Sequence, residues 1–177
     1  SIRHLLTRLR GHRDRLDPTA GYSQAHDDFS RAIDLNPKDG AACHARATVR
    51  NDQAIYAEGE KERMELWRNA LKDSDRAIVL NPANLVYVLQ RAMLLTNLGA
   101  PTSGPVDGAL LERALQDYRQ VVDARPREAA PRLNRGKCLT HLRRKEEAVA
   151  ELRMAATLDP SLREEVDYWL RKNGVKP

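Results

Sequence analysis

Aromatic residues and cysteines are scarce in this chain of 177 residues. Phenylalanine, tyrosine and tryptophan make up 5% of it, and its two cysteines, Cys43 and Cys138, lie far apart. Free cysteine packs like a small hydrophobic residue, so we expect both thiols to be buried and reduced. Two scattered thiols, with no histidines at a matching spacing, exclude a cysteine–histidine metal site.

The chain also has no long hydrophobic run. No apolar stretch approaches the roughly 18 residues that a membrane-spanning helix needs, so we expect no membrane partner. The first residues, SIRHLLTRLRGHR, lack the apolar core of a signal peptide, which favours the cytoplasm without fixing the compartment. An initiator methionine is missing, so one hypothesis makes this region a regulatory appendage of a larger bacterial protein.

The patterns of common enzyme sites are absent too. Gly99, Gly104 and Gly108 are spaced irregularly and bracketed by prolines, unlike a glycine-rich phosphate loop. A catalytic pair needs hydrogen-bond reach and a third group that orients it. His44 and His141 have no serine, cysteine or carboxylate at a convincing partner spacing. The sequence therefore predicts a protein that is not an enzyme and that holds no cofactor or metal.

Charge is distributed unevenly along the chain. Lysine and arginine outnumber aspartate and glutamate by 30 to 25. Residues 1–16 and 125–145 are basic clusters, which form a solvated face or attract acidic peptides or nucleic acid. No aromatic residues alternate with these arginines to stack on bases, so nucleic acid is the less favoured partner. The second cluster comprises Arg125, Arg127, Arg132, Arg135, Lys137, Arg143, Arg144 and Lys145.

A short pattern occurs four times. A small residue is followed four positions later by a larger or polar one, three later by another small one, and five later by proline. Successive prolines lie 45, 44 and 34 residues apart, and such periods are typical of helical repeat arrays. Short side chains seven residues apart share one helix face, where a second helix can approach closely. The copies are Ala25-Phe29-Ala32-Pro37, Ala70-Ser74-Ala77-Pro82, Ala114-Tyr118-Val121-Pro126 and Ala148-Leu152-Ala155-Pro160.

These segments, such as LLERALQDYRQVVDARP, resemble the tetratricopeptide repeat, a pair of antiparallel helices that stacks on its neighbours. The match covers nearly all of the chain and is strongest in the last unit. The resemblance implies an all-α fold, a right-handed α-solenoid of antiparallel helix pairs with about four repeats and a C-terminal capping helix. The residues that carry the match in the last unit are Gly136, Ala148, Leu152, Ala155 and Pro160.

The resemblance divides a single domain, residues 1–177, into units. They span about residues 2–37 (degenerate), 40–82, 84–126 and 129–160, followed by the capping helix at 161–174. The second unit contains a helical insertion with its turn near Glu58-Gly59, and the third contains a loop insertion rich in proline and glycine. The predicted helices span about residues 2–16, 22–35, 40–57, 61–80, 84–98, 107–124, 129–142, 146–158 and 162–172.

Side chains that begin or end helices support these boundaries. Each repeated proline lacks an N–H and is expected to end a second helix. Asp39, Asn84 and Asp107 stand where a helix needs an N-cap oxygen. Ser161 and Glu164 fit a capping box for the last helix. The residues of that helix expected to cover the final unit are Val166, Trp169 and Leu170.

In the family that the chain resembles, the first helix of each pair lines a concave groove. Carried over to this sequence, the groove is apolar in the middle, polar before it and basic at both ends. Such a floor suits an extended or helical peptide with an apolar anchor and acidic flanks. The predicted groove residues are His44, Thr48, Asn51, Leu89, Met93, Asn97, Leu133, Lys137 and His141.

The sequence thus predicts a non-enzymatic protein–protein interaction scaffold that binds a peptide or protein segment in this groove. Self-association is an alternative, because Ile2, Leu5, Leu6 and Leu9 form a stripe that a second copy could cover. The regulatory appendage is a third hypothesis. Electrostatic binding of nucleic acid is the weakest, and its affinity would fall steeply with added salt.

Overall fold

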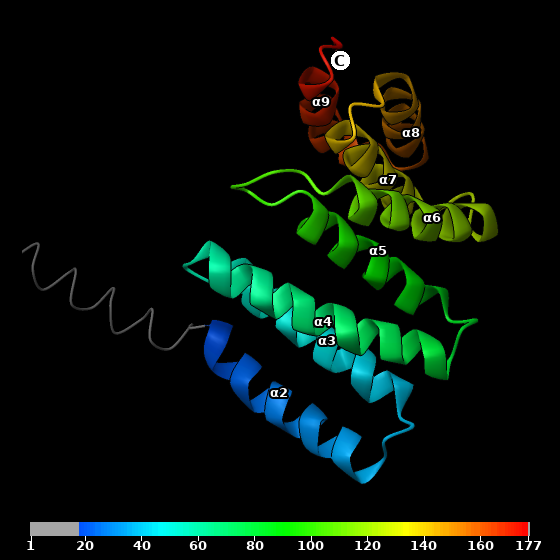
Figure 1. Ribbon diagram of the computed structural model, residues 1–177. Coiled ribbons are helices and arrows are strands. Elements are labelled where there is room, and N and C mark those ends of the chain that lie inside the picture. Colours follow the sequence, from blue (N-terminus) through cyan, green and yellow to red (C-terminus); the bar gives the residue numbers. More distant parts are fainter. Residues whose placement is uncertain (1–17, 177) are drawn as a thin grey trace, which may run out of the picture.

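The structure of the protein, a computed structural model, describes residues 18–176, with side chains from residue 21 (Figure 1). The described part is all-α, as predicted, and contains no strand. Helices follow one another as antiparallel pairs in a stack. They are α2 (Pro18–Leu35), α3 (Gly40–Tyr56), α4 (Glu60–Leu80), α5 (Leu85–Gly99), α6 (Gly108–Ala124), α7 (Ala129–His141), α8 (Lys145–Leu158), the 3-10 helix η1 (Pro160–Leu162) and α9 (Arg163–Lys172).

Helix boundaries match the predicted ones to within one residue, with α2 as the exception. The helix predicted at residues 2–16 and the apolar stripe on it lie outside the described residues. α2 begins at Pro18, four residues before the predicted start at residue 22. Proline suits the first helical position, because an N–H there would have no acceptor within the helix.

The small residues of the repeated pattern lie between packed helices. In the second and fourth copies the alanines are fully buried. Gly136 of α7 packs most closely, because a Cβ added to it would lie 2.8 Å from the Cγ of Leu152 on α8. Short side chains therefore allow the helices of a pair to approach, as the spacing predicts. The alanines concerned are Ala70, Ala77, Ala148 and Ala155.

Each repeated proline occupies the same kind of turn. The residue before the proline makes the last helical hydrogen bond, as from the Asn81 N–H to the Ala77 carbonyl at 2.9 Å. Two residues after the proline, an N–H returns to the carbonyl that precedes it, as from Asn84 to Asn81 at 3.2 Å. This is a turn with proline at its second position. The same two bonds recur around Pro37, Pro126 and Pro160.

The predicted N-caps of α3, α5 and α6 are present. Asp39, Asn84 and Asp107 each accept backbone N–H groups in the first turn of their helices, at 2.9–3.1 Å. These bonds satisfy donors that the helix itself leaves without a partner. Local capping therefore accounts for where three of the helices begin.

The start of α9 differs from the prediction. The capping box expected from Ser161 and Glu164 is wrong, because Asp159 accepts both the N–H and the hydroxyl of Ser161, at 3.0 and 2.7 Å. The chain then makes the turn of η1 and enters α9 two residues later. Val166 and Leu170 are buried against the last pair, as expected of a capping helix.

The two insertions take the predicted forms. The first lengthens α3 and α4, which meet at a turn over residues 57–59. The second is the loop of residues 100–107, closed by a bond from the Asp107 N–H to the Gly99 carbonyl at 2.8 Å. Gly104 in this loop has φ +114°, a conformation that favours glycine. Both insertions project from the same edge of the stack, at the left in Figure 1.

The first helices of the pairs form a row. The Cα atoms of α3 approach those of α5, α5 approaches α7, and α7 approaches α9. No such approach joins α2 to α4, α4 to α6, or α6 to α8. Because the first helices lie closer together than the second helices, the stack curves toward α3, α5, α7 and α9. We call this the inner row.

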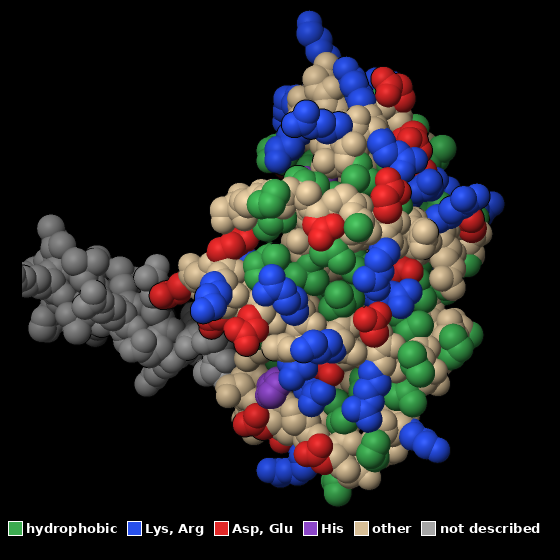
Figure 2. Space-filling model, viewed as in Figure 1, with side chains coloured by type: hydrophobic (Ala, Val, Ile, Leu, Met, Phe, Trp, Pro, Cys, Tyr) green, Lys and Arg blue, Asp and Glu red, His purple; other side chains and the backbone are tan. Residues whose placement is uncertain are grey.

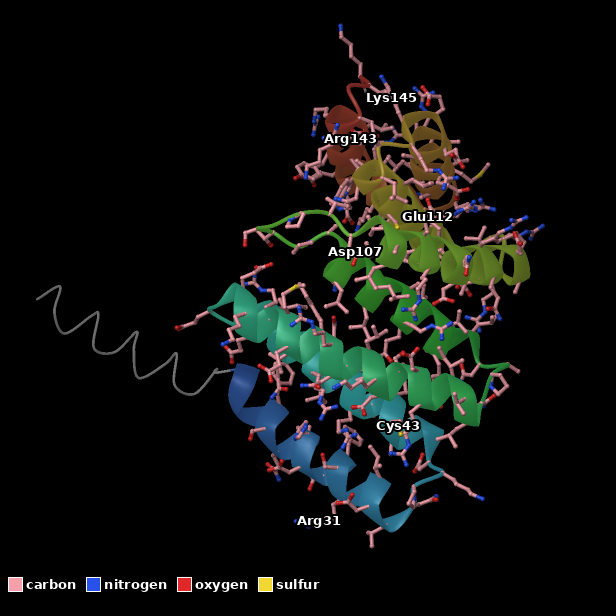
Figure 3. All side chains as sticks on the ribbon, viewed as in Figure 1. Arg31, Cys43, Asp107, Glu112, Arg143 and Lys145 are labelled. Carbon is pink, nitrogen blue, oxygen red and sulfur yellow. The ribbon has the colours of Figure 1, made fainter. Side chains whose placement is uncertain are left out.

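The buried thiols give a direct test of this packing. Cys43 on α3, labelled in Figure 3, and Cys138 on α7 are free and fully buried, as predicted. Burial raises the pKa of Cys138 to about 12, and it also raises the pKa of Cys43. Because the thiolate is the reactive form, an aromatic disulfide reagent at about pH 8 should modify the native chain roughly 100-fold more slowly than the unfolded chain. Similar rates, followed by absorbance, would contradict the burial.

Candidate functional site

The exposed middle of the inner row lies on α5. Val86 and Met93 are 45% and 40% exposed, although most apolar side chains of this helix are buried. Asn97 lies one turn after Met93 on the same face, and its amide makes no hydrogen bond to the described residues. Leu89 is half-buried and packs against the core between α5, α6 and α7. The apolar surface that a partner can reach on α5 is therefore Val86 and Met93.

Polar side chains of α3 are tied to α5. His44 Nδ1 donates to Gln90 Oε1 at 2.8 Å, and the Gln90 amide donates to Thr48 Oγ1 at 2.7 Å. The His44 ring also packs on Tyr87, with ring centroids 4.8 Å apart. These contacts hold the two helices in register. Gln90 was not among the predicted groove residues, although it lies one turn after Val86 on the same face.

Asn51, near the end of α3, supports the pair of helices to which it belongs. Its Oδ1 accepts the indole N–H of Trp67 at 3.2 Å, and that tryptophan is buried on α4. Burying an indole requires a partner for its N–H, which Asn51 supplies. Thr48 is the predicted groove residue of α3 that remains exposed.

The capping helix α9 covers the part of the groove predicted on α7. Leu133 is 4% exposed and packs with Val166 and Leu170 of α9. Its position on α7 led to its prediction as a groove residue, but α9, which follows η1, packs against this side chain. In this structure Leu133 is a core residue, so we assign it no contact with a partner.

Lys137 and His141 are engaged by the same helix. Lys137 Nζ lies 2.6 Å from Glu165 Oε1, which compensates its charge. The His141 ring meets Trp169 edge-on, with centroids 5.5 Å apart. Burial lowers the pKa of His141, and so does the nearby charge of Lys172, so the imidazole is neutral at neutral pH.

The helix pairs α3–α4, α5–α6 and α7–α8 each contain a salt bridge between their two helices, which was not predicted from the sequence. In two of the pairs a guanidinium donates through Nε and Nη2 to both oxygens of a buried aspartate, at 2.6–2.8 Å. In the last pair one bond of 3.1 Å joins arginine to glutamate. The sequence does contain the signal, because each carboxylate lies three residues after the first alanine of its copy. The pairs are Arg46–Asp73, Arg91–Asp117 and Arg135–Glu151.

The same arginines also connect neighbouring pairs. Arg46 donates to the Ser30 hydroxyl on α2 at 3.2 Å, and Arg91 donates to Asp75 on α4 at 3.2 Å. Each of these two side chains therefore joins three helices. A planar guanidinium with five donors suits this position, and the compact ammonium of lysine does not.

Most of the basic cluster within residues 125–145 is neutralised. Five of its eight members form ion pairs with carboxylates at 2.6–3.3 Å. Figure 2 shows the two signs of charge interspersed over the C-terminal helices on the visible face. The cluster therefore offers nucleic acid less positive charge than the sequence indicates. The paired members are Arg125, Arg132, Arg135, Lys137 and Arg144.

Within residues 18–176 no helix has both the length and the apolar character needed to cross a bilayer. In the same part of the chain, no three histidine, cysteine or carboxylate side chains come together as metal ligands.

Solved structures of helical repeat proteins superpose on this chain. MamA from Desulfovibrio magneticus RS-1 matches with a TM-score of 0.69 at 13% identity, over 93% of this chain and 83% of that one. TTC0263, a thermophilic TPR protein from Thermus thermophilus, matches with 0.68 at 16%, over 90% and 76%. The Arabidopsis OM64 TPR domain matches with 0.50 at 25%, over 71% and 94%. The chain has a tetratricopeptide-repeat fold.

Sequence comparison adds nothing to this assignment. No family model matches the chain, and no curated protein matches it. The tetratricopeptide-repeat fold expected from the fourfold pattern is confirmed by the structural likeness. A function must therefore be inferred from the side chains that this tetratricopeptide-repeat array exposes.

Proposed function

We propose that the protein is an interaction scaffold that binds a peptide or protein segment along the inner row, centred on α5. The exposure of Val86 and Met93 supports this most strongly, because the rest of α5 is well packed. Fully burying an exposed Val or Met is worth about 1.5–3 kcal/mol, so covering the exposed 40–45% of each of these side chains is worth about 0.6–1.4 kcal/mol. Two of them on one face can anchor a segment.

Two asparagines add hydrogen-bonding capacity to the inner row. The amides of Asn97 on α5 and Asn134 on α7 make no hydrogen bond to the described residues. Asn134 was not among the predicted groove residues, but it lies one turn before Lys137, which was, on the same face of α7. A carboxamide donates and accepts at once, so it can hold the main chain of an extended segment. The segment that fits combines an apolar anchor with exposed peptide groups.

The centre of this segment should be uncharged. The exposed side chains of the inner row on α3 and α5 are neutral, and they include Thr48, Ile55, Val86 and Met93. Lys137, the basic residue predicted at one end, is already paired with Glu165. The acidic flanks expected from the sequence therefore have no free partner in Lys137.

Peptides selected from a phage-displayed library against the full chain test this function. Fluorescence anisotropy would compare the wild type, the double variant Val86→Glu/Met93→Glu, and the control Val79→Glu. Val79 is 80% exposed on α4, a second helix, so the control adds a charge of the same sign outside the inner row. The double variant should bind at least about tenfold more weakly, equal to about 1.4 kcal/mol, with the control unchanged. If the double variant and the control bound the peptide equally well, the proposal that the segment binds along the inner row would be rejected.

We propose self-association as a second candidate, favoured by the exposure of α2. Ala25, Phe29 and Ala32 carry the first copy of the pattern but are only half-buried, whereas their counterparts in the other copies are fully buried. Leu35, at the end of α2, is 82% exposed. Light scattering over a dilution series separates the cases. A mass that falls toward the monomer on dilution supports association, and a constant monomer mass rejects it.

A further inference from the structure

A hollow lies outside the inner row, between α4, α6 and the loop of residues 100–107. Its volume is about 520 Å³, within the range of roughly 300–1,000 Å³ that is usual for ligand sites. Its floor is apolar and is formed by Met64 and Leu71 of α4, Leu98 of α5 and Leu110 of α6. Figure 2 shows hydrophobic side chains exposed between α4 and this loop. We call this hollow the edge cleft.

Both insertions that interrupt the repeat contribute to the edge cleft. The first insertion supplies the beginning of α4 up to and including Met64. Arg68 lies one turn later on the same face of this helix. The second supplies the opposite wall, through Pro101 and Pro105 in the loop and Asp107 at its end. An array built from uninterrupted repeats would have neither wall.

Arg68 gives the edge cleft a positive rim. Its side chain is exposed and forms no ion pair or hydrogen bond with the described residues. Asp107, the carboxylate that lines the cleft, is engaged by α6, because its Oδ1 accepts the N–H groups of Ala109 and Leu110. The positive end of the α6 dipole offsets that negative charge further. The charge left for a ligand is therefore the guanidinium of Arg68.

The loop also offers main-chain groups to a ligand. From Pro101 to Val106 it makes no backbone–backbone hydrogen bond to the described residues. The bond between Asp107 and Gly99 closes the loop and holds it over the cleft. An extended peptide can pair with such groups as an added strand does. This favours a peptide over a ligand without a main chain.

We propose that the edge cleft binds an extended peptide segment in which a large apolar side chain and an acidic one are two residues apart, and so share one face of the segment. The apolar side chain lies on the floor, the carboxylate pairs with Arg68, and the peptide main chain pairs with the loop. This site is separate from the inner row, so one array can hold two segments.

Titration of the isotope-labelled full chain, followed by NMR, tests the edge cleft. The probe is the hexapeptide Gly-Ser-Phe-Ser-Glu-Gly with both termini capped. Saturable shifts are expected in residues 64–71 and 100–107, and Arg68→Gln should raise the Kd about twofold to fivefold. The control Arg31→Gln removes another exposed arginine, on α2 and away from Asp107 in Figure 3, and should change nothing. A probe with glutamine in place of glutamate should bind wild type and Arg68→Gln equally.

Four results would overturn the proposal. The first is no saturable shift, or shifts that are unchanged in Arg68→Gln. The second is shifts in α3 and α5 that vanish in Val86→Glu/Met93→Glu, which would assign the probe to the inner row. The third is the same shifts on concentrating the protein without peptide, which would assign the cleft to a second copy. The fourth is tighter binding of octanoate than of the peptide, which would assign it to a free fatty acid anion.

Discussion

Replacing Asp73 by asparagine is expected to lower the free energy of unfolding by about 3–5 kcal/mol. The carboxylate is 5% exposed and accepts bonds from Arg46 at 2.6 and 2.8 Å and from Arg50. Both guanidinium groups are mostly buried, with side chains 16% and 18% exposed. Losing the charge of Asp73 leaves two positive charges between α3 and α4 without their counter-ion. Urea unfolding followed by circular dichroism measures the change.

Asp75→Asn is the matched control for Asp73→Asn. Asp75 is also on α4 and also pairs with an arginine, Arg91, but its side chain is 44% exposed. Arg91 keeps its bidentate contact with Asp117 in this variant. The expected loss is below about 1 kcal/mol, as for exposed ion pairs. Equal losses for the two variants would mean that the buried pair contributes no more than a surface pair.

Replacing Leu152 by alanine is expected to lower the free energy of unfolding by about 2–5 kcal/mol. Leu152 is fully buried among Leu133, Val166 and Leu170. Its replacement leaves a cavity at the junction of α7, α8 and α9. The cavity persists because the alanine side chain is too short to fill it and closing it would require all three helices to shift. Urea unfolding of the full chain gives the value.

A double-mutant cycle with Gly136 shows whether the close approach of α7 and α8 is the cause. Gly136→Ala alone places its Cβ 2.8–2.9 Å from Leu152 and should cost about 1–3 kcal/mol. In the double variant the new methyl group enters the space that Leu152 vacates. The combined loss should therefore be smaller than the sum of the single losses by about 1 kcal/mol. Additive losses would mean that the two side chains do not compete for the same space.

The helices were predictable because their limits are local. A proline, the residue before it and a capping side chain decide where each helix ends and the next begins, and all of these lie within four residues. Asn81-Pro82 and Asn84 illustrate this, since one turn holds the last bond of α4 and the cap of α5. The exception at Ser161 has the same cause, because the carboxylate of Asp159 is a stronger acceptor two residues earlier.

Contacts between helices were harder to predict. The pairing of Arg46 with Asp73 depends on which helix faces lie opposite each other. The position of the carboxylate, three residues after the first alanine of the repeated pattern, becomes informative once this pairing is known. Leu133 satisfies the groove pattern by its helical position, yet α9 buries it after a turn that the pattern does not describe. The edge cleft could not be predicted either, because its walls come from two insertions outside the repeat.

Hydrogen–deuterium exchange tests the proposed binding face most directly. The full chain would be measured by mass spectrometry with and without the tightest-binding peptide from the library. Binding along the inner row predicts slower exchange in α5 and in the adjoining parts of α3 and α7, with α4 and α6 unchanged. Slower exchange confined to α4, α6 or the loop of residues 100–107 would contradict it.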